Sequence, residues 1–280
     1  MEDFSDAQID RYARHLVLPE IGEAGQRRLI QARVLVVGAG GLGSPLLLYL
    51  AAAGVGYLGI IDHDTVDLSN LQRQVLHSTD DVGRLKVESA RAHLRALNPE
   101  VEVVVHPERL TPDNALDLIA DYDIVADGSD NFATRFLVAD ACHLARRTLV
   151  SAAMMRFEGQ LSVYRSHLGH GVDGTENPCW RCVYPEQPDS NFKASCADVG
   201  VLASLPGVLG TLQATEVVKE IVGFGRSLAG RLLLYEGLEG RFSELRIKAD
   251  THCPLCSEEA RITSIHADTY RDTAASYAAE

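Results

Sequence analysis

A glycine-rich segment, Gly38-Ala-Gly-Gly-Leu-Gly43, has the spacing in this chain that is best suited to binding a ligand. It follows an apolar run, Val34–Val37, and precedes a predicted helix, which is the context in which a G-x-G-x-x-G segment binds a nucleotide. Glycines permit a tight turn, and free N–H groups at the helix start can face phosphate oxygens. Asp62 ends the next predicted strand, where an acidic residue can bond a ribose hydroxyl. We expect an adenine nucleotide here; the alternative is a turn needed only for packing.

Two cations follow this segment in the chain. Arg73 lies in the polar stretch after Asp62, and Lys86 opens the next predicted helix. A helix start can neutralise most of the pyrophosphate of a dinucleotide, whereas a triphosphate with a good leaving group needs added positive charge. Each cation alone is more typical of a solvated surface. Together with the glycine segment they favour ATP over NAD or FAD.

Acidic residues end another predicted strand, in Asp127-Gly-Ser-Asp130-Asn131. The carboxyl ends of strands are where open α/β sheets bind ligands, and Mg²⁺ takes one or two carboxylates together with phosphate oxygens. Asp130 is therefore a predicted Mg²⁺ ligand. The alternative is that Asp130 caps the helix that follows.

Four of the six cysteines form two C-x-x-C pairs, Cys179/Cys182 and Cys253/Cys256. Four thiolates at this spacing suit a tetrahedral structural zinc site, which would tie a long loop to the C-terminal part of the chain. Two redox pairs, or reduced thiols, are the alternatives. Cys142 lies in an apolar predicted helix and is expected to serve packing.

The elements that must position these residues alternate in type along the chain. Strands are predicted at 34–37, 57–61, 101–106, 124–126 and 149–152, with helices at 42–53, 85–97, 113–120 and 132–146. This order predicts a Rossmann-like α/β fold with a doubly wound, mainly parallel sheet. Further strands at 161–163, 232–235 and 244–247 are expected to extend it, with a long helix at 208–222 and a short strand at 261–265. Residues 1–32 are expected to be helical, with Ile9, Tyr12, Ala13 and Leu16 on one face.

Composition narrows the class of protein. The chain has 280 residues, 46% of them hydrophobic, so it can bury a proper core. A formal net charge of −13 argues against binding nucleic acid or anionic membranes, because both need a surplus of Lys and Arg. No window approaches the roughly 18 apolar residues of a membrane span. We expect a soluble cytoplasmic protein.

Several segments together resemble the MoeB/ThiF/HesA family of sulfur-carrier-protein adenylyltransferases, bacterial relatives of the ubiquitin-activating enzymes. They are Arg11-Tyr-Ala-Arg14, Gly38–Gly43, Asp62–Asp64, Ser69-Asn-Leu-Gln-Arg-Gln74, Gly83-Arg-Leu-Lys86, Asp127–Asn131, Arg156-Phe-Glu-Gly-Gln160 and the two cysteine pairs. The resemblance covers nearly the whole chain up to Cys256. It is closest to the molybdopterin-synthase adenylyltransferases.

This resemblance implies an activity and a set of residues. A ubiquitin-like sulfur carrier ending in Gly-Gly, MoaD-like or ThiS-like, would be adenylated with ATP and Mg²⁺, giving an acyl-adenylate and pyrophosphate. Thiocarboxylate formation for molybdenum cofactor or thiamine biosynthesis would follow. The implied nucleotide-binding residues are Gly38, Gly40, Gly41, Gly43, Asp62, Asp64, Ser69, Asn70, Leu71, Gln72, Arg73, Lys86, Asp130 and Asn131. In an implied homodimer, Arg14 would reach the partner's ATP.

The resemblance also divides the chain and raises a question about Cys196. It implies a helical segment at 1–32, an ATP-binding part at 33–155, a part at 156–256 that binds the carrier and zinc and holds the crossover loop, and a tail at 257–280. Cys196 matches a loop cysteine that some relatives use for a thioester or persulfide, and a spectator thiol is the alternative. Lys193 would lower the pKa of that thiol modestly.

The chain departs from the family pattern at two points, and two carriers are possible. Ser257 stands where relatives often have Gly, and no rhodanese-like part follows, so sulfur is expected from another protein, such as a cysteine desulfurase or a rhodanese. The segment 156–160 favours a molybdopterin-type carrier, whereas Tyr184-Pro-Glu-Gln-Pro is similar to thiazole-type enzymes. An NAD- or FAD-dependent oxidoreductase and a non-catalytic scaffold are the alternatives from other classes.

Overall fold

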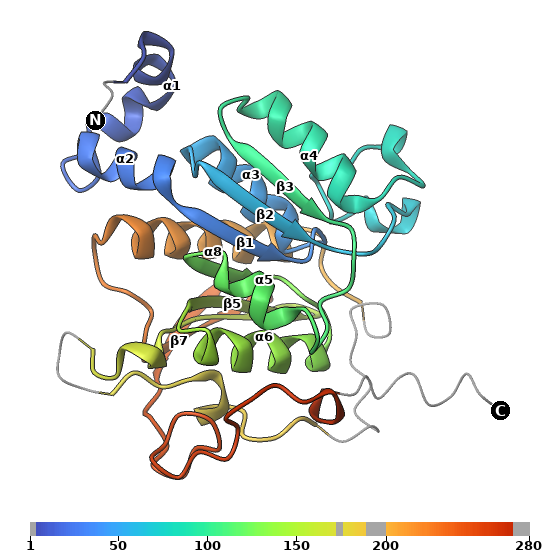
Figure 1. Cartoon of the computed structure of the whole chain (residues 1–280). Coiled ribbons are helices and arrows are strands. Elements are labelled where there is room, and N and C mark those ends of the chain that lie inside the picture. The colour runs from blue at the N-terminus through green and yellow to red at the C-terminus, as the bar shows by residue number, and fades with distance from the viewer. Residues whose placement is uncertain (1–3, 172–175, 189–199, 271–280) are drawn as a thin grey trace.

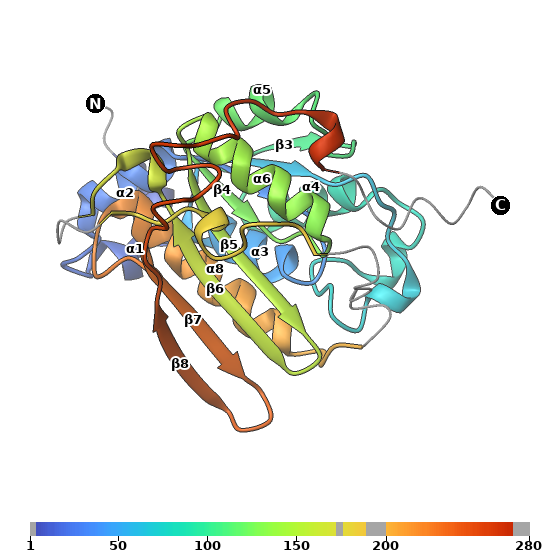
Figure 2. The ribbon, with the colours of Figure 1, turned by 90° about the horizontal axis from the view of Figure 1, so that it is seen from below.

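One eight-stranded sheet runs through the computed structural model, which describes residues 4–171, 176–188 and 200–270 (Figure 1). Its strand order is β3-β2-β1-β4-β5-β6-β7-β8. The parallel strands are β1 (Arg33–Val37), β2 (Tyr57–Ile61), β3 (Glu102–His106), β4 (Ile124–Asp127) and β5 (Thr148–Met155). The antiparallel strands are β6 (Glu158–Tyr164), β7 (Arg231–Glu236) and β8 (Arg241–Arg246). Figure 2 shows β7 and β8 extending from the body as a hairpin.

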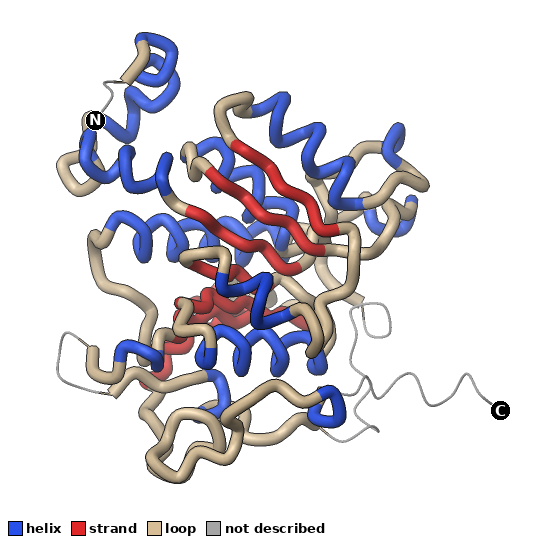
Figure 3. Tube along the Cα trace, viewed as in Figure 1, coloured by secondary structure: helices blue, strands red, loops and turns tan. Residues whose placement is uncertain are grey.

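Helices cover both faces of the parallel part of the sheet (Figure 3). One face packs against α3 (Gly43–Ala53), α4 (Lys86–Leu97) and α8 (Leu205–Val222), through leucines, valines and alanines that are almost fully buried. The other face packs against α5 (Ala115–Ala120) and α6 (Phe132–Leu144). Apolar residues on both faces of a strand are typical of parallel sheets between helix layers. The prediction of a doubly wound, mainly parallel sheet extended by antiparallel strands is confirmed.

The remaining elements are short or lie at the chain start. They are α1 (Asp6–Leu16), α2 (Gly22–Gln31) and the 3₁₀ turns Leu68–Asn70, Thr79–Asp81, Ser166–Leu168, Trp180–Cys182 and Ala267–Thr269. A capping box between Ser5 and Gln8 starts α1, because the Ser5 side chain accepts from the Gln8 N–H and the Gln8 side chain accepts from the Ser5 N–H. No described helix is long and apolar enough to cross a membrane.

The helices predicted within residues 1–32 are present, and one local prediction was wrong. The stretch 261–265 forms no strand, because the N–H groups of Arg261 and Ile262 both donate to the Pro254 carbonyl and close a turn over the second cysteine pair. On α1, Tyr12 is buried and Ile9 remains 45% exposed. Tyr12 donates from its hydroxyl to Glu100 and accepts from the Asn98 side chain, so polar contacts contribute to the packing of this helix.

The glycine segment lies where β1 ends and α3 begins, next to the residues that follow β4. Gly38 has a φ of +93°, a conformation that L side chains rarely adopt. A Cβ on Gly43 would lie 1.9 Å from the Gly38 carbonyl oxygen, so the helix start and the loop approach each other too closely for any side chain. Strands β1 and β4 are neighbours whose connections lead to opposite faces, which is where such sheets bind ligands.

We expect Gly43→Ala to lower the free energy of unfolding by about 1–3 kcal/mol, because its methyl group overlaps backbone that cannot move aside. Gly40→Ala is the matched control in the same loop. Its Cβ would come no closer than 3.6 Å to the Gln74 side chain, so we expect a change within about 0.5 kcal/mol. Urea denaturation measures both, and equal losses from the two variants would contradict the close-approach argument.

Candidate functional site

A cavity of about 440 Å³ lies at the carboxyl ends of the parallel strands. We call it the main cavity. One part of its lining consists of predicted nucleotide-binding residues, namely Gly38, Gly40, Gly41, Asp62, Asp64, Arg73, Lys86, Asp130 and Asn131. The other part includes Phe132, Arg135, Met154, Gln160, Trp180 and Tyr184. The predicted nucleotide-binding residues in this lining extend from Gly38 to Asn131, so the fold brings together residues up to 93 positions apart.

Six predicted site residues do not line this cavity. Gly43 lies behind the loop, where it allows the close approach described above. Ser69, Asn70, Leu71 and Gln72 lie in and after a 3₁₀ turn, and Arg14 is exposed on α1. Cys196 is outside the described residues. The roles predicted for these residues stay predictions.

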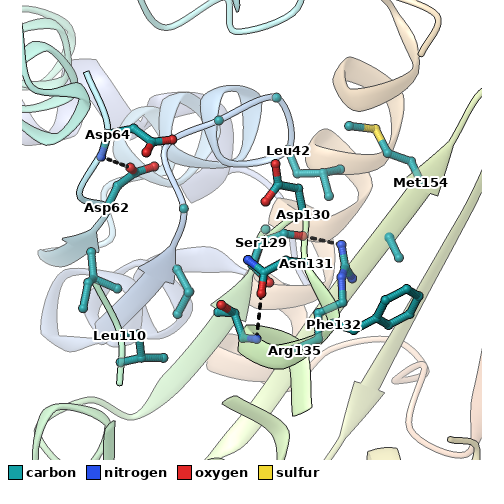
Figure 4. Close-up of a pocket in the computed structure, with 18 of the residues that line it drawn as sticks. Leu42, Asp62, Asp64, Leu110, Ser129, Asp130, Asn131, Phe132, Arg135 and Met154 are labelled. Atoms are coloured by element: carbon teal, nitrogen blue, oxygen red, sulfur yellow. Dashed lines mark hydrogen bonds between the residues drawn. The ribbon is translucent and has the colours of Figure 1, made fainter. Parts of the chain in front are cut away.

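Asp62 ties the loops that follow β1 and β2 together. One oxygen, Oδ2, accepts from the Ala39 N–H at 2.8 Å, and the other, Oδ1, accepts from the Asp64 N–H at 2.8 Å. Figure 4 shows Asp62 and Asp64 on the side of the cavity facing Asp130. Each carboxylate oxygen can accept more than one hydrogen bond, so Asp62 retains capacity for a ligand hydroxyl.

Lys86 is buried at the start of α4, where its ammonium group contacts Asp64. Lys86 Nζ lies 2.9 Å from Asp64 Oδ2, and Lys86 is only 5% exposed. Partial burial raises the pKa of Asp64, but the hydrogen bond and charge of Lys86 outweigh it and leave that pKa below its ordinary value. The buried Lys86 side chain therefore lines the cavity together with its Asp64 partner.

Arg73 is held by the 3₁₀ turn that precedes it. Asp67 caps this turn by accepting from the Ser69 N–H at 2.8 Å, and Arg73 Nη1 donates to the Ser69 carbonyl at 3.2 Å. Within the described part of the chain, this bond to a neutral acceptor is the one hydrogen bond of the Arg73 side chain, so most of its guanidinium donors are available there. Arg73 therefore brings a positive charge to the main cavity without neutralising it on a carboxylate.

Asp130 and Asn131 have different roles at the start of α6. The Asn131 side chain caps the helix by accepting from the Thr134 N–H at 2.8 Å, so the alternative role of Asp130 as the cap is wrong. Asp130 is exposed, and no hydrogen bond or ion pair joins it to another described residue. Its carboxylate is therefore available to a ligand at the cavity (Figure 4).

Arg135, a residue of α6 that lines the main cavity, is absent from the predicted site residues. Arg135 is buried, donates to the carbonyls of Ala152, at 2.8 Å, and Ser129, and lies 4.0 Å from Asp127. Asp127 is 1% exposed and also accepts from Ser151 Oγ. Asp127 is thus a structural carboxylate. A lone arginine among apolar residues of a predicted helix was the available signal.

Aromatic side chains form the wall of the cavity beyond α6. Trp180 stacks on Tyr184 with ring centroids 4.6 Å apart, and it packs edge-on against Phe136 and Tyr164. Tyr184 donates from its hydroxyl to Gln160 of β6 at 2.8 Å. Because Trp180 lies between Cys179 and Cys182, this wall is directly connected to the first cysteine pair.

The four predicted metal-ligating cysteines converge in space. Their sulfurs all lie within 4.8 Å of one another, with 3.4 Å between Cys179 and Cys253 and between Cys182 and Cys256. A zinc ion about 2.3 Å from each sulfur requires sulfurs about 3.8 Å apart, whereas a disulfide requires about 2.05 Å. The cluster therefore fits a four-coordinate metal, and the arrangement of two separate redox pairs is not favoured.

A buried ion pair fastens this cluster to α6. Arg181, between the paired cysteines, contacts both oxygens of Asp140 at 2.9 and 2.6 Å, and Tyr270 donates to the same carboxylate at 2.8 Å. Asp140 is fully buried. Cys142, two residues further along α6, is also buried, and burial raises the pKa of its thiol, in agreement with its predicted packing role.

Sequence similarity to known proteins extends over most of this chain. "Sulfur carrier protein adenylyltransferase" of Thermus thermophilus is 48% identical over 90% of this chain and 92% of that protein. "Adenylyltransferase and sulfurtransferase MOCS3" of Bos taurus is 54% identical over 93% of this chain. The match spans only 56% of the MOCS3 protein, so this chain corresponds to about half of that longer relative.

The fold also matches solved structures. A crystal structure of Escherichia coli MccB aligns with a TM-score of 0.77 and 23% sequence identity over 91% of this chain and 76% of that one, which supports the architecture alone. The ThiF family model matches residues 12–255, which include the glycine loop, both cavity cations, the first cysteine pair and Cys253 of the second. The chain therefore belongs to the ThiF family.

Proposed function

We propose that this protein uses ATP to adenylate the C-terminal carboxylate of a ubiquitin-like sulfur carrier that ends in Gly-Gly. The observation that carries the proposal is that Arg73 and Lys86 line the same cavity as the glycine loop and Asp62. Family membership and the name of the Thermus relative support it. An NAD- or FAD-dependent oxidoreductase has no use for two cations there.

The chemistry needs charge stabilisation more than proton transfer. A carboxylate oxygen of the carrier attacks the α-phosphorus of ATP, and the bond from that phosphorus to the oxygen bridging to the β-phosphate breaks. Pyrophosphate leaves with the electron pair, and the carrier keeps an acyl-adenylate. Positioning for in-line attack and positive charge near the leaving pyrophosphate supply most of the acceleration. Arg73 and Lys86 are the residues placed to do so.

The proposal gives the remaining nucleotide contacts to the glycine loop and to the residues beside it. The loop N–H groups of Gly40 and Gly41 bind phosphate oxygens, Asp62 accepts from the ribose, and Asn131 stays close to the nucleotide as the α6 cap. The free carboxylate of Asp130 fits Mg²⁺, which when bound neutralises phosphate charge. Ser69, Asn70, Leu71 and Gln72 act through the turn that holds Arg73.

The second part of the cavity lining is where we place the carrier tail. Gln160, Trp180 and Tyr184 belong to the proposed carrier-binding part, 156–256, of the same domain that binds ATP with residues 33–155. A Gly-Gly tail suits this narrow, aromatic-walled space because it carries no side chains. A MoaD-like carrier and molybdenum cofactor biosynthesis are favoured over a ThiS-like carrier and thiamine biosynthesis, on the segment 156–160.

The proposal includes further partners. The protein acts in the cytoplasm as a homodimer in which the exposed Arg14 reaches the partner's ATP. Sulfur comes from a separate donor, such as a cysteine desulfurase or a rhodanese. Whether Cys196 forms a covalent link is tested by Cys196→Ala, which abolishes sulfur transfer and spares adenylation if the link is required.

The cysteine cluster is proposed to hold a structural zinc ion. Four thiolates leave no open coordination position, so zinc would fix the chain and take no part in the reaction. It would hold Trp180 against the cavity and Arg181 against Asp140.

Replacing Arg73 tests the proposed role of the cavity cations. We expect Arg73→Ala to slow carrier-dependent ATP–pyrophosphate exchange by about 100-fold or more, since it removes charge near the leaving group. The unfolding free energy should change by less than about 0.5 kcal/mol. Arg95→Ala, an exposed arginine on α4, is the control and should leave both unchanged. Equal losses of activity and stability for Arg73→Ala would contradict the assignment.

The same assay, run with each candidate carrier, identifies the substrate. Exchange that requires one Gly-Gly carrier and Mg²⁺ supports adenylation and names the pathway. No exchange with any carrier, together with tight NAD binding, would favour the oxidoreductase.

Metal content tests the zinc proposal. Freshly purified protein should contain about one zinc per chain. Cys256→Ser should lower this content and shift the fluorescence of Trp180, the only tryptophan in the chain. Cys142→Ala, at a buried position within α6, should retain the metal. Substoichiometric zinc in the wild-type protein would count against the site.

A further inference from the structure

His77 is a buried, titratable residue near the main cavity to which the proposed chemistry gives no role. It lies four residues after Arg73 and is 7% exposed. Its Nε2 atom lies 2.9 Å from the carbonyl oxygen of Ala39, and its Nδ1 atom lies 2.8 Å from Ser89 Oγ. Ala39 is inside the glycine loop, and Ser89 is in the first turn of α4, the helix that Lys86 begins. His77 therefore bridges the two elements that would bind phosphates.

The protonation of His77 follows from its surroundings. Burial lowers its pKa, and the hydrogen bond to Ala39 offsets this only in part, so the imidazole is neutral at neutral pH. A carbonyl oxygen can only accept, so Nε2 carries the proton and donates to Ala39. Nδ1 then accepts from the Ser89 hydroxyl.

The direction of the Ala39 carbonyl also determines the direction of the next N–H group, because both belong to one peptide unit. That unit also contains the Gly40 N–H, and in a planar trans peptide the C=O and N–H bonds point in opposite directions. Holding the Ala39 oxygen toward His77 therefore turns the Gly40 N–H away from His77. Gly40 lines the main cavity, and its N–H donates no hydrogen bond to another described residue.

The Ala39 N–H is fixed as well, since it donates to Asp62 at 2.8 Å. Residue 39 is thus held through both of its backbone polar groups, one by the proposed ribose-binding carboxylate and one by His77. A flipped Ala39–Gly40 peptide would present an oxygen to the cavity in place of an N–H. Such an oxygen would repel a phosphate group.

We propose that His77 is a positioning residue that holds the Ala39–Gly40 peptide so that the Gly40 N–H faces the cavity as a donor to a nucleotide phosphate. Through Ser89, the same side chain keeps the loop aligned with Lys86. The inference rests on the proposed ATP-dependent function. A histidine that only fills space in the core is the competing explanation.

Matched variants of His77 separate the two explanations. The amide nitrogen of His77→Gln can take the place of Nε2 and still donate to Ala39, whereas the shorter His77→Asn reaches only the Ser89 side. We expect His77→Asn to weaken binding of a non-hydrolysable ATP analogue by about tenfold or more, as expected for a lost hydrogen bond to a charged group. His77→Gln should stay within about threefold of wild type, and the KM for the carrier should change in neither.

Thermal unfolding midpoints of both variants accompany the binding measurement. A space-filling role would lower the midpoint in both variants and reduce the fraction of active protein, without a difference in affinity between Gln and Asn. Equal affinities of the two variants, whether reduced or unchanged, would overturn the inference while leaving the proposed function intact. A wild-type protein that binds no ATP would overturn both.

A measurement on the wild-type protein does not depend on any variant folding. ATP binding should slow hydrogen exchange of the Gly40 amide and shift its ¹⁵N resonance, because that N–H gains an acceptor. The Ala39 amide, already bonded to Asp62, is the internal control and should change less. An unchanged Gly40 amide at saturating ATP would overturn the inference.

Discussion

The close approach of the glycine loop to the start of α3 is the constraint on which the nucleotide site depends. Only glycine at position 43 lets the helix begin against the Gly38 carbonyl, and this contact places the loop at the carboxyl end of β1. Asp62 then joins that loop to the end of β2 through two short hydrogen bonds. The frame of the site is thus built from backbone groups held in place by one carboxylate, to which the Arg73 and Lys86 side chains are added.

Charge is added to this backbone frame in a way that keeps it available. The protein as a whole is strongly acidic, and a cation near the cavity has many carboxylates with which it could pair. Lys86 is buried and held by Asp64, whereas Arg73 is held by a carbonyl. Burial shields Lys86 from solvent screening, and the neutral partner of Arg73 leaves its charge uncompensated. Lys86 thus has a carboxylate partner that fixes its position, whereas Arg73 supplies the uncompensated charge that would attract a triphosphate.

The loops that contain the cysteine pairs depend on a different kind of interaction. Strand β6 and helix α8 are part of the apolar core, whereas β8 at the edge of the sheet is exposed throughout. The cysteine cluster, the Arg181–Asp140 pair and the aromatic stack around Trp180 hold the loops against α6. Separating the buried Arg181–Asp140 pair would leave a charge unpaired, which is costly, so the pair holds this segment in place. Trp180 of the cavity wall lies in the same segment and is held with it.

The sequence alone was sufficient to predict the elements that are determined by neighbouring residues. The alternation of apolar strands with helical segments predicted the sheet, because burial on both faces leaves a continuous apolar run, and the glycine spacing predicted the loop. The spacing of the cysteines predicted their cluster. The prediction of a short strand at 261–265 was wrong, because two of its N–H groups donate to the Pro254 carbonyl in a turn. No residue pattern predicts that turn.

Contacts between distant segments were decided only by the fold. His77 resembles many buried histidines in sequence, and its link to Ala39 exists because the segment after Arg73 passes beneath the loop. Arg135, Trp180 and Tyr184 became cavity residues in the same way. Residue types and local spacing indicate which chemistry is possible, because a turn or a helix start is determined by a few neighbouring residues. Which groups meet depends on the packing of the whole sheet, and that sum of many weak long-range contacts is not written in any single motif.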